Sequence, residues 1–150
     1  MMELDKINAN ILQELENNGR ISNNDLAQKV GLSPSACLRR VQELERQEII
    51  TGYKATINRK IYGIGTILFV TVRLSEHTQK AQKSFEKVMK HAPEVRECHN
   101  ITGNFEYLLR IEVPSLDSYK EFHTNTLGSI PQVTEIITYV SLESPKDERA

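Results

Sequence analysis

The first third of the sequence is divided into short segments by residues that start or end helices. Between residues 5 and 17, apolar residues recur at helical spacing with polar residues between them. Asn18-Gly19 ends this first segment, because such a pair tolerates a positive φ. A second segment begins at Ser22 or Asn23, which both suit a helix N-cap, and Gly31 ends it. The pattern therefore predicts short helices in close succession.

A third helix is predicted directly after Gly31. Ser33 suits the N-cap of this helix, and Pro34 suits its first position. An apolar stripe follows at helical spacing: Cys37, Leu38, Val41 and Leu44. The opposite face carries small, polar and charged residues: Ser35, Ala36, Arg39, Arg40, Gln42, Glu43 and Arg46. A short helix, a glycine turn and a second helix with an arginine-bearing face form the layout of a helix-turn-helix motif.

The polar face of this third helix has the chemistry that binding to duplex DNA requires. Small residues at Ser33, Ser35 and Ala36 allow the helix N-terminus to approach a groove, where its free N–H groups can meet phosphates. Arg39 and Arg40 have the reach and the planar geometry to bind guanine edges or phosphates. The alternative is a plain three-helix bundle in which these arginines are only solvated surface.

The distribution of charge favours DNA as the partner. The whole chain has 19 basic and 20 acidic side chains and a formal net charge of −1. Residues 20–60 carry eight basic and four acidic side chains, so this stretch is +4, whereas residues 1–19 are −3 and residues 61–150 are −2. A polyanion-binding surface needs local basic density, not a basic average. The expected DNA-binding residues are two phosphate contacts and six residues at the start of the third helix: Arg20 and Lys29, then Ser33, Pro34, Ser35, Ala36, Arg39 and Arg40.

The remainder of the chain alternates between strand and helix patterns. Residues 47–58 favour a short extended linker or strand, and glycines at 63 and 65 indicate a boundary near residue 60. Beyond it, strands are predicted at 66–74, 95–102, 106–113 and 133–142, and helices at 78–91 and 116–127. The polar tail, residues 143–150, is expected to be loose.

This order of elements, β-α-β-β-α-β, is typical of the ferredoxin-like fold. The predicted fold class is therefore α+β, with a winged-type helix-turn-helix domain at residues 1–60 and a ferredoxin-like sandwich at residues 61–150. Two sets of residues are expected to bury the helices of the sandwich: Ala81, Phe85, Val88 and Met89, and Leu116, Tyr119, Phe122 and Leu127.

The strand at residues 66–74 has apolar residues on both of its faces. One face carries Leu68, Val70, Val72 and Leu74, and the other carries Ile67, Phe69, Thr71 and Arg73. In a ferredoxin-like fold both helices lie on one face of the sheet, so the other face must find cover elsewhere. We predict a homodimer in which two such sheets pack face to face.

Several other classes of protein are disfavoured by the sequence. The longest apolar run, residues 67–70, is too short to span a membrane, and the N-terminus lacks the layout of a secretory signal. Two cysteines, Cys37 and Cys98, make neither a disulfide framework nor a cysteine zinc site, and the reducing cytosol is the expected compartment. Cys98 and His99 would point to opposite faces of a strand. Because patterns typical of a nucleophilic triad or a phosphate-binding loop are also missing, neither a metal site nor catalytic residues are expected.

Taken together, the chain resembles the Lrp/AsnC family of transcriptional regulators, also called feast/famine regulators, from about Leu4 to Leu142. The resemblance rests on a series of short pieces in the family's order: Leu4-Asp5, Asn10-Ile11-Leu12, Gly19-Arg20-Ile21-Ser22, residues 30–34, 37–41 and 44–45, Ile50-Thr51-Gly52-Tyr53, Glu97-Cys98-His99 and residues 103–109. It implies an N-terminal DNA-binding domain with its recognition helix at about residues 34–46, a β linker, and a C-terminal domain that oligomerises and senses amino acids. Dimers in this family often assemble further, into octamers.

The resemblance also implies an effector pocket between subunits, built from a turn and from part of the last strand. The residues implied are Thr102, Gly103, Asn104, Phe105, Glu106, Tyr107, Thr134, Glu135 and Ile136. Asn104 and Glu106 stand where the family's GDxDYLL pattern frequently has aspartates. Glu106 could still pair with a ligand ammonium, and the backbone N–H groups of the turn with its carboxylate. The alternative for Glu106 is a surface carboxylate at the end of a strand. The expected ligand is a small amino acid such as leucine or methionine, with no further cofactor.

We interpret the chain as a sequence-specific DNA-binding regulator of amino-acid-related genes, tuned by that effector. Two alternatives remain at this stage. Sirohaem decarboxylases share the two-part architecture, and they would need basic or histidine side chains facing a large central pocket. The second alternative is a purely structural oligomerisation module, in which Arg39 and Arg40 would have no function.

Overall fold

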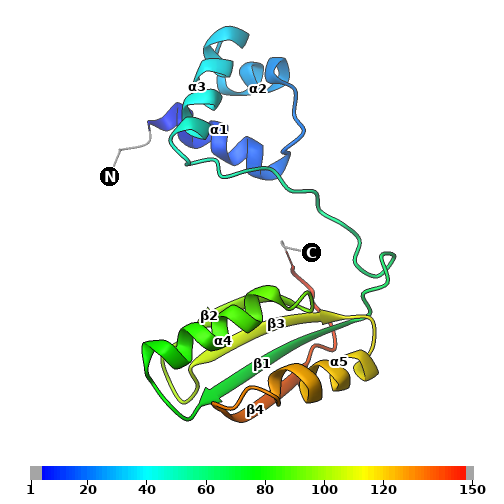
Figure 1. Ribbon diagram of the computed structural model, residues 1–150. Coiled ribbons are helices and arrows are strands. Elements are labelled where there is room, and N and C mark those ends of the chain that lie inside the picture. Colours follow the sequence, from blue (N-terminus) through cyan, green and yellow to red (C-terminus); the bar gives the residue numbers. More distant parts are fainter. Residues whose placement is uncertain (1–4, 148–150) are drawn as a thin grey trace. The chain divides into compact units, whose positions relative to one another are not determined.

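The structure is a computed structural model, and it describes residues 5–147 of the chain (Figure 1). The chain consists of two compact units, Met1–Ala55 and Thr56–Ala150. Leu4, with which the family resemblance begins, and residues 148–150 of the tail lie outside the described residues.

Three helices make up the N-terminal unit: α1 (Lys6–Asn17), α2 (Asn23–Val30) and α3 (Pro34–Arg46). Each begins at a side-chain oxygen that accepts a backbone N–H of the first turn, from the caps Asp5, Ser22 and Ser33. Gly31 ends α2 with a φ of 72°, the left-handed conformation that glycine adopts readily. α1 ends differently, because Asn18 is extended with a φ of −149°. The positive φ expected for the Asn18-Gly19 pair is therefore wrong, although the three helices, the N-caps Ser22 and Ser33 and the glycine end of α2 are confirmed.

A small apolar core joins the helices of this unit. Its buried members come from all three: Ile11, Leu26, Ala27, Cys37 and Leu44. Leu38 was expected on the same buried side, but 46% of it is exposed. Successive residues are rotated by about 100° around a helix, so Leu38 lies outside the arc that its neighbour Cys37 shares with Leu44. The prediction that Leu38 belongs to the core is wrong.

The segment that follows α3 consists of turns, bends and irregular backbone, with no strand between residues 47 and 65. An extended segment becomes a strand only where a neighbour shares its backbone hydrogen bonds, and β-branched residues alone do not supply one. Of the two alternatives that the sequence left for residues 47–58, the segment is therefore a linker, and neither the strand nor the β linker that the resemblance implied is formed. Tyr53 anchors the start of this segment, because its hydroxyl donates to Glu45 Oε1 at 2.9 Å.

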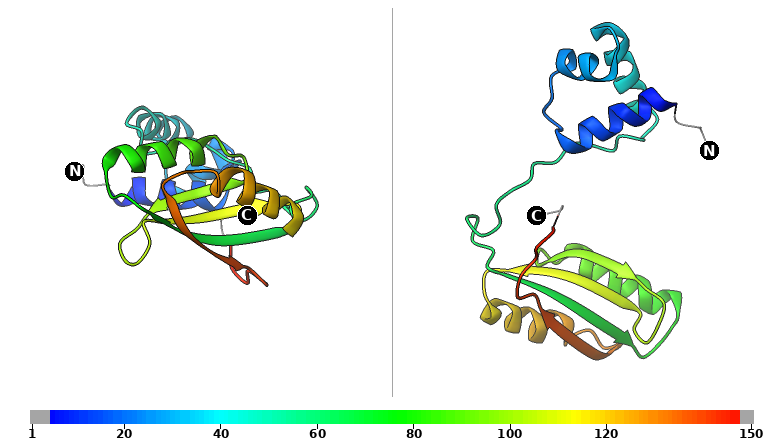
Figure 2. Two further views of the ribbon diagram at one scale, coloured as in Figure 1. Left: turned by 60° about the horizontal axis from the view of Figure 1, so that its bottom comes forward. Right: turned by 180° about the vertical axis from the view of Figure 1, so that it is seen from behind.

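The C-terminal unit is an antiparallel four-stranded sheet with helices on one face (Figures 1 and 2). In chain order its elements are β1 (Thr66–Leu74), α4 (Gln79–His91), β2 (Val95–Asn100), β3 (Tyr107–Val113), α5 (Leu116–Phe122), the π-helical turn η1 (His123–Leu127) and β4 (Val133–Val140). The strand order is β2-β3-β1-β4. The α+β class and the ferredoxin-like arrangement are therefore confirmed.

One face of β1 and one face of β3 form the core of this unit, against α4 and α5. The buried strand residues are Leu68, Val70, Val72, Leu74, Tyr107, Leu109, Ile111 and Val113. Phe85 and Met89 of α4 cover them, together with Tyr119, Phe122 and Leu127. Two residues that the sequence placed in this core are exposed, Val88 to 36% and Leu116 to 54%. Both lie at the margin of their helix's apolar stripe, where helical spacing does not separate core from surface.

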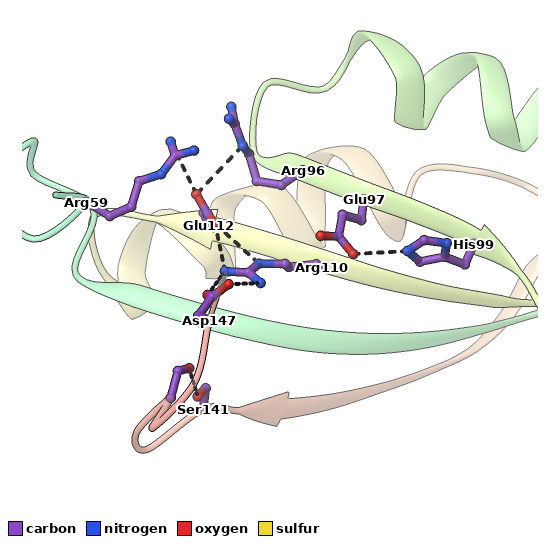
Figure 3. A network of polar contacts seen from close by, with 9 residues as sticks. Arg59, Arg96, Glu97, His99, Arg110, Glu112, Ser141 and Asp147 are labelled. Carbon is purple, nitrogen blue, oxygen red and sulfur yellow. Dashed lines mark hydrogen bonds and ion pairs between the residues drawn. The ribbon is translucent and has the colours of Figure 1, made fainter. Parts of the chain in front are cut away.

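A buried carboxylate fastens both ends of the C-terminal unit to the sheet. Only 2% of the Glu112 side chain is exposed, and it lies among three arginines (Figure 3). Its oxygens lie 3.5 Å from Nη1 of Arg59, 3.7 Å from Nε of Arg96 and 3.2 Å from Nη2 of Arg110. Arg110 Nη1 also donates to Asp147 Oδ1 at 3.1 Å, so the tail is held at this residue, contrary to the loose tail that the sequence predicted. A buried charge requires such partners, because water no longer solvates it.

Gly65, which precedes β1, provides a test of the packing around this strand. A Cβ added there would lie 2.8 Å from the carbonyl oxygen of Pro114, whereas one added at Gly19 would meet Tyr53 at an ordinary 3.5 Å. We predict that Gly65→Ala lowers the free energy of unfolding by about 1–3 kcal/mol through this clash, and that Gly19→Ala leaves it nearly unchanged. Urea unfolding followed by circular dichroism measures both, and equal midpoints for the two variants would contradict the prediction.

Candidate functional site

The N-terminal half of α3 presents an exposed polar face. Ser35, Arg39 and Gln42 are all exposed, and their spacing of i, i+4 and i+7 places them on one side of the helix. In the part of the chain that the structure describes, Arg39 forms no salt bridge and no side-chain hydrogen bond. Ser33 and Pro34 are exposed at the helix start, and Ala36 is half-buried. The residues predicted for close approach to DNA therefore lie together at this end of α3.

Two of the other predicted DNA contacts are engaged with α1. Arg40 Nη1 donates to Asp5 Oδ2 at 2.6 Å and to Asn8 Oδ1 at 3.0 Å. The hydrogen bond from Arg40 is the main reason why the pKa of Asp5 is lowered. Lys29 Nζ lies 2.6 Å from Glu14 Oε2. In the free chain these two cations therefore hold α3 and α2 against α1.

The C-terminal end of α3 is neutralised within the helix. Arg46 Nε donates to Glu43 Oε2 at 2.9 Å, and Gln47 donates to the same carboxylate. These hydrogen bonds, the one from Arg46 first, lower the pKa of Glu43 to about 2. The side chain of Arg20 lies outside this arrangement, exposed in the turn between α1 and α2. The unneutralised positive charge of α3 is therefore that of Arg39.

The predicted effector residues surround the far end of β1. Glu106 Oε2 accepts the backbone N–H of Leu74 at 2.8 Å, and Glu106 Oε1 lies 3.2 Å from His77 Nδ1. Only 14% of the Glu106 side chain is exposed. Glu106 is therefore a fixed part of this end of the sheet and not merely a surface carboxylate.

Arg73 joins the turn before β3 to the start of β4. Its Nε donates to the carbonyl oxygen of Asn104 at 2.9 Å, and its guanidinium lies 5.1 Å from the ring centroid of Phe105. On the other side, Nη1 lies 3.2 Å from Glu135 Oε2, and Thr134 Oγ1 donates to the Arg73 carbonyl. Asn104, Phe105, Thr134 and Glu135 are thus brought together.

Two predicted effector residues face the core instead. Tyr107 is 1% exposed, and its hydroxyl donates to Glu86 Oε1 at 2.7 Å. Burial, followed by this bond to Glu86, raises the pKa of Tyr107 to about 12. Ile136 also packs against the core. Thr102 and Gly103 are exposed in the turn, where Gly103 has a φ of 126° that favours glycine.

Arg73 and His77 were not among the predicted site residues, although both belong to this end of the sheet. The available signal was a charged residue, Arg73, at the end of an otherwise apolar strand. Its partners lie 31 and 62 positions further along the chain, at Asn104 and Glu135, and local spacing does not reveal contacts at such separations.

The sheet face opposite the helices is partly apolar. Phe69 is 38% exposed and its neighbour on β4, Tyr139, is 55% exposed. Half-buried Ile67, Leu108 and Ile137 lie on the same face. Thr71 Oγ1 is buried there without a hydrogen-bond partner among the described residues. Figure 2 shows that α4 and α5 leave this face uncovered.

Among residues 5–147, no cluster of three or more His, Cys, Asp or Glu side chains has a geometry that could hold a metal ion. None of the helices in this range has the length and apolar character that crossing a bilayer requires. Cys37 and Cys98 are both free thiols.

Comparison with known proteins identifies both units. Residues 4–51 match a winged helix-turn-helix DNA-binding domain. Residues 67–150 match the Lrp/AsnC ligand-binding domain. These two matches define a two-part regulator with one DNA-binding and one ligand-binding domain. The chain belongs to the Lrp/AsnC family of transcriptional regulators, as the sequence resemblance predicted.

Individual relatives resemble the chain over nearly its whole length. The leucine-responsive regulatory protein of Escherichia coli K12 is 40% identical over 144 residues, which cover 96% of this chain and 88% of that protein. A transcriptional regulator from Neisseria meningitidis, solved in complex with L-methionine, has a TM-score of 0.92 and 32% identity, covering 97% of this chain and 94% of that one. An AsnC-family regulator from Agrobacterium tumefaciens has a TM-score of 0.90 and 29% identity, covering 95% and 93%.

Proposed function

We propose that this regulator binds duplex DNA through the N-terminal half of α3 and controls amino-acid-related genes. The observation that carries the proposal is Arg39, an exposed arginine with no counter-ion among the described residues, on the polar face of α3. A guanidinium in this position can bind guanine O6 and N7 in the major groove. Selection of bound duplexes from a random library by the full chain, with and without a panel of amino acids, tests the proposal. Failure to enrich any sequence would refute it.

The other candidate DNA-binding residues have three different proposed roles, according to what surrounds each of them. Ser33, Pro34, Ser35 and Ala36 let the N-terminus of α3 approach the groove, and Arg20 and Lys29 bind phosphates. Lys29 must exchange Glu14 for a phosphate, which costs little because exposed ion pairs contribute little net stability. Arg40, which Asp5 and Asn8 hold, orients α3 against α1, and any contact with DNA would require it to leave them.

We predict different effects for two substitutions in this unit. Arg39→Ala should lower affinity for a selected duplex by about tenfold or more relative to random DNA, because a base contact is lost. Lys29→Ala should weaken binding to both duplexes alike and reduce the slope of log K against log salt by about one. Fluorescence anisotropy at several salt concentrations measures both effects.

Arg46→Ala is the matched control, because Glu43 already neutralises Arg46. It should leave the affinity for both duplexes nearly unchanged. An equal loss of selectivity for Arg39→Ala and Arg46→Ala would refute the assignment of base readout to Arg39.

We also propose that two copies pair through the sheet face opposite the helices. The exposed apolar residues Phe69 and Tyr139 lie on that face, where a second sheet would bury them. A pair of recognition helices from such a dimer suits a pseudo-palindromic site. Further assembly of dimers, into octamers, belongs to the same proposal.

Phe69→Glu should convert the dimer into monomers, because each interface would then bury two unpaired carboxylates. Val88→Glu places the same charge at a residue of similar exposure on α4, 36% against 38%, and should leave the dimer intact. Sedimentation equilibrium at micromolar concentration distinguishes these outcomes. A monomeric unsubstituted chain, or equal dissociation of both variants, would contradict the proposed interface.

A small amino acid such as leucine or methionine is the effector that we propose for the end of the sheet at Glu106. Relatives from Neisseria meningitidis and Mycobacterium tuberculosis were solved with L-methionine. Glu106 provides a carboxylate for the ligand ammonium, and the turn at Gly103 provides backbone N–H groups for its carboxylate. By linkage, the effector changes DNA affinity by the factor by which DNA changes effector affinity. We propose no catalytic step, no further cofactor and no metal for this role, and the cytoplasm as its location.

Glu106→Gln tests this assignment while preserving the shape of the side chain. The amide oxygen can still accept the Leu74 N–H, but the charge that would pair with an ammonium is lost. We predict a loss of about tenfold or more in affinity for L-leucine or L-methionine by titration calorimetry. Glu76→Gln, an exposed control near the same end of β1, should change the affinity little. Unchanged binding to the Glu106→Gln variant would exclude this role for Glu106.

A further inference from the structure

α3 exposes one large apolar side chain beside its polar face. Cys37 and Leu44 are buried and Val41 is half-buried, but Leu38 is 46% exposed. All residues of α3 are described, and Leu38 is the one large apolar side chain among them that is exposed. The core of the N-terminal unit therefore leaves Leu38 free for another contact.

The position of Leu38 relates it to the residues proposed to face DNA. It lies three residues after Ser35 and four before Gln42, separations at which side chains are neighbours on a helix surface. Arg39, which has no counter-ion among the described residues, is rotated from Leu38 by about 100° around the helix, so Leu38 borders the polar face on the side of Ser35 and Gln42. When α3 occupies a major groove with Arg39 toward the bases, Leu38 therefore lies along the same groove.

The major groove offers one apolar group to a side chain that cannot form hydrogen bonds. Guanine, cytosine and adenine present donors and acceptors there, whereas thymine also presents its C5 methyl group. A leucine placed against a donor or acceptor would desolvate it without compensation. Against a thymine methyl group, the leucine removes from water both its own apolar surface and that of the methyl group.

We propose that Leu38 contacts the C5 methyl group of a thymine and thereby makes the regulator select that base at one position of its site. The proposal rests on the proposed function of α3 as the DNA-reading helix. It adds an apolar readout next to the charged readout by Arg39. A site of this kind would also accept 5-methylcytosine, which carries a methyl group at the same place in the groove.

Replacement of thymine by deoxyuridine is the direct test, because it removes the methyl group and keeps the base pair. Duplexes selected by the full chain are resynthesised with each thymine replaced in turn. The unsubstituted protein should lose about fourfold in affinity at one position of each half-site, the effect expected for one buried methyl group. Leu38→Ala should bind the thymine and deoxyuridine duplexes equally, and Leu38→Met should retain part of the difference.

The controls separate this proposal from the proposed function. Leu116→Ala removes a leucine of similar exposure, 54%, from α5 and should preserve the full preference for thymine. If the unsubstituted protein selects DNA but binds deoxyuridine duplexes as well as thymine duplexes, the readout by Leu38 is refuted while DNA binding stands. The readout by Leu38 is also refuted if Leu38→Ala lowers the affinity for the thymine and deoxyuridine duplexes equally, because that would indicate that Leu38 contacts protein. If no duplex is selected at all, the proposed function itself fails.

Discussion

Burial of one face of β1 is the interaction on which the C-terminal unit depends. Leu68, Val70, Val72 and Leu74 are each at most 2% exposed, and complete burial of such a side chain contributes about 1.5–3 kcal/mol. β1 is paired with β3 on one side and β4 on the other, so both neighbouring strands are placed by it. α4 and α5 cover the face of β1 that carries these four residues. The opposite face, with Phe69 and Tyr139, is therefore left as a surface on which an oligomer can form.

The polar contacts of β3 connect regions that the apolar core does not reach. Near its start, Glu106 bonds to the end of β1 and His77. Near its end, Glu112 binds Arg59 from the segment that leads away from the N-terminal unit. β3 and the residue just before it, Glu106, therefore carry both the candidate effector contacts and the attachment of the linker.

Periodicity and cap residues were sufficient to predict the elements but not all of their surfaces. Ser33 and Pro34 placed the start of α3 correctly, because capping is a local interaction between residues close in sequence. The pattern failed at Leu38, Val88 and Leu116, where a residue lies at the margin of an apolar stripe. It also did not reveal the pairing of Arg40 with Asp5 or of Arg110 with Asp147, which lie 35 and 37 positions apart. Contacts between long charged side chains depend on tertiary structure, and the candidate site consists largely of such contacts.

Ion pairs within the N-terminal unit explain part of the uneven distribution of charge in the first 60 residues. Two acidic residues of the first stretch pair with basic residues of the second, since Asp5 binds Arg40 and Glu14 binds Lys29. Much of the local positive charge is therefore balanced within the N-terminal unit before any ligand arrives. A polyanion must compete for Arg40 and Lys29, whereas Arg39 has no counter-ion among residues 5–147. For this reason the specificity of the proposed DNA contact depends on a few side chains of α3 more than on the net charge of the stretch that contains them.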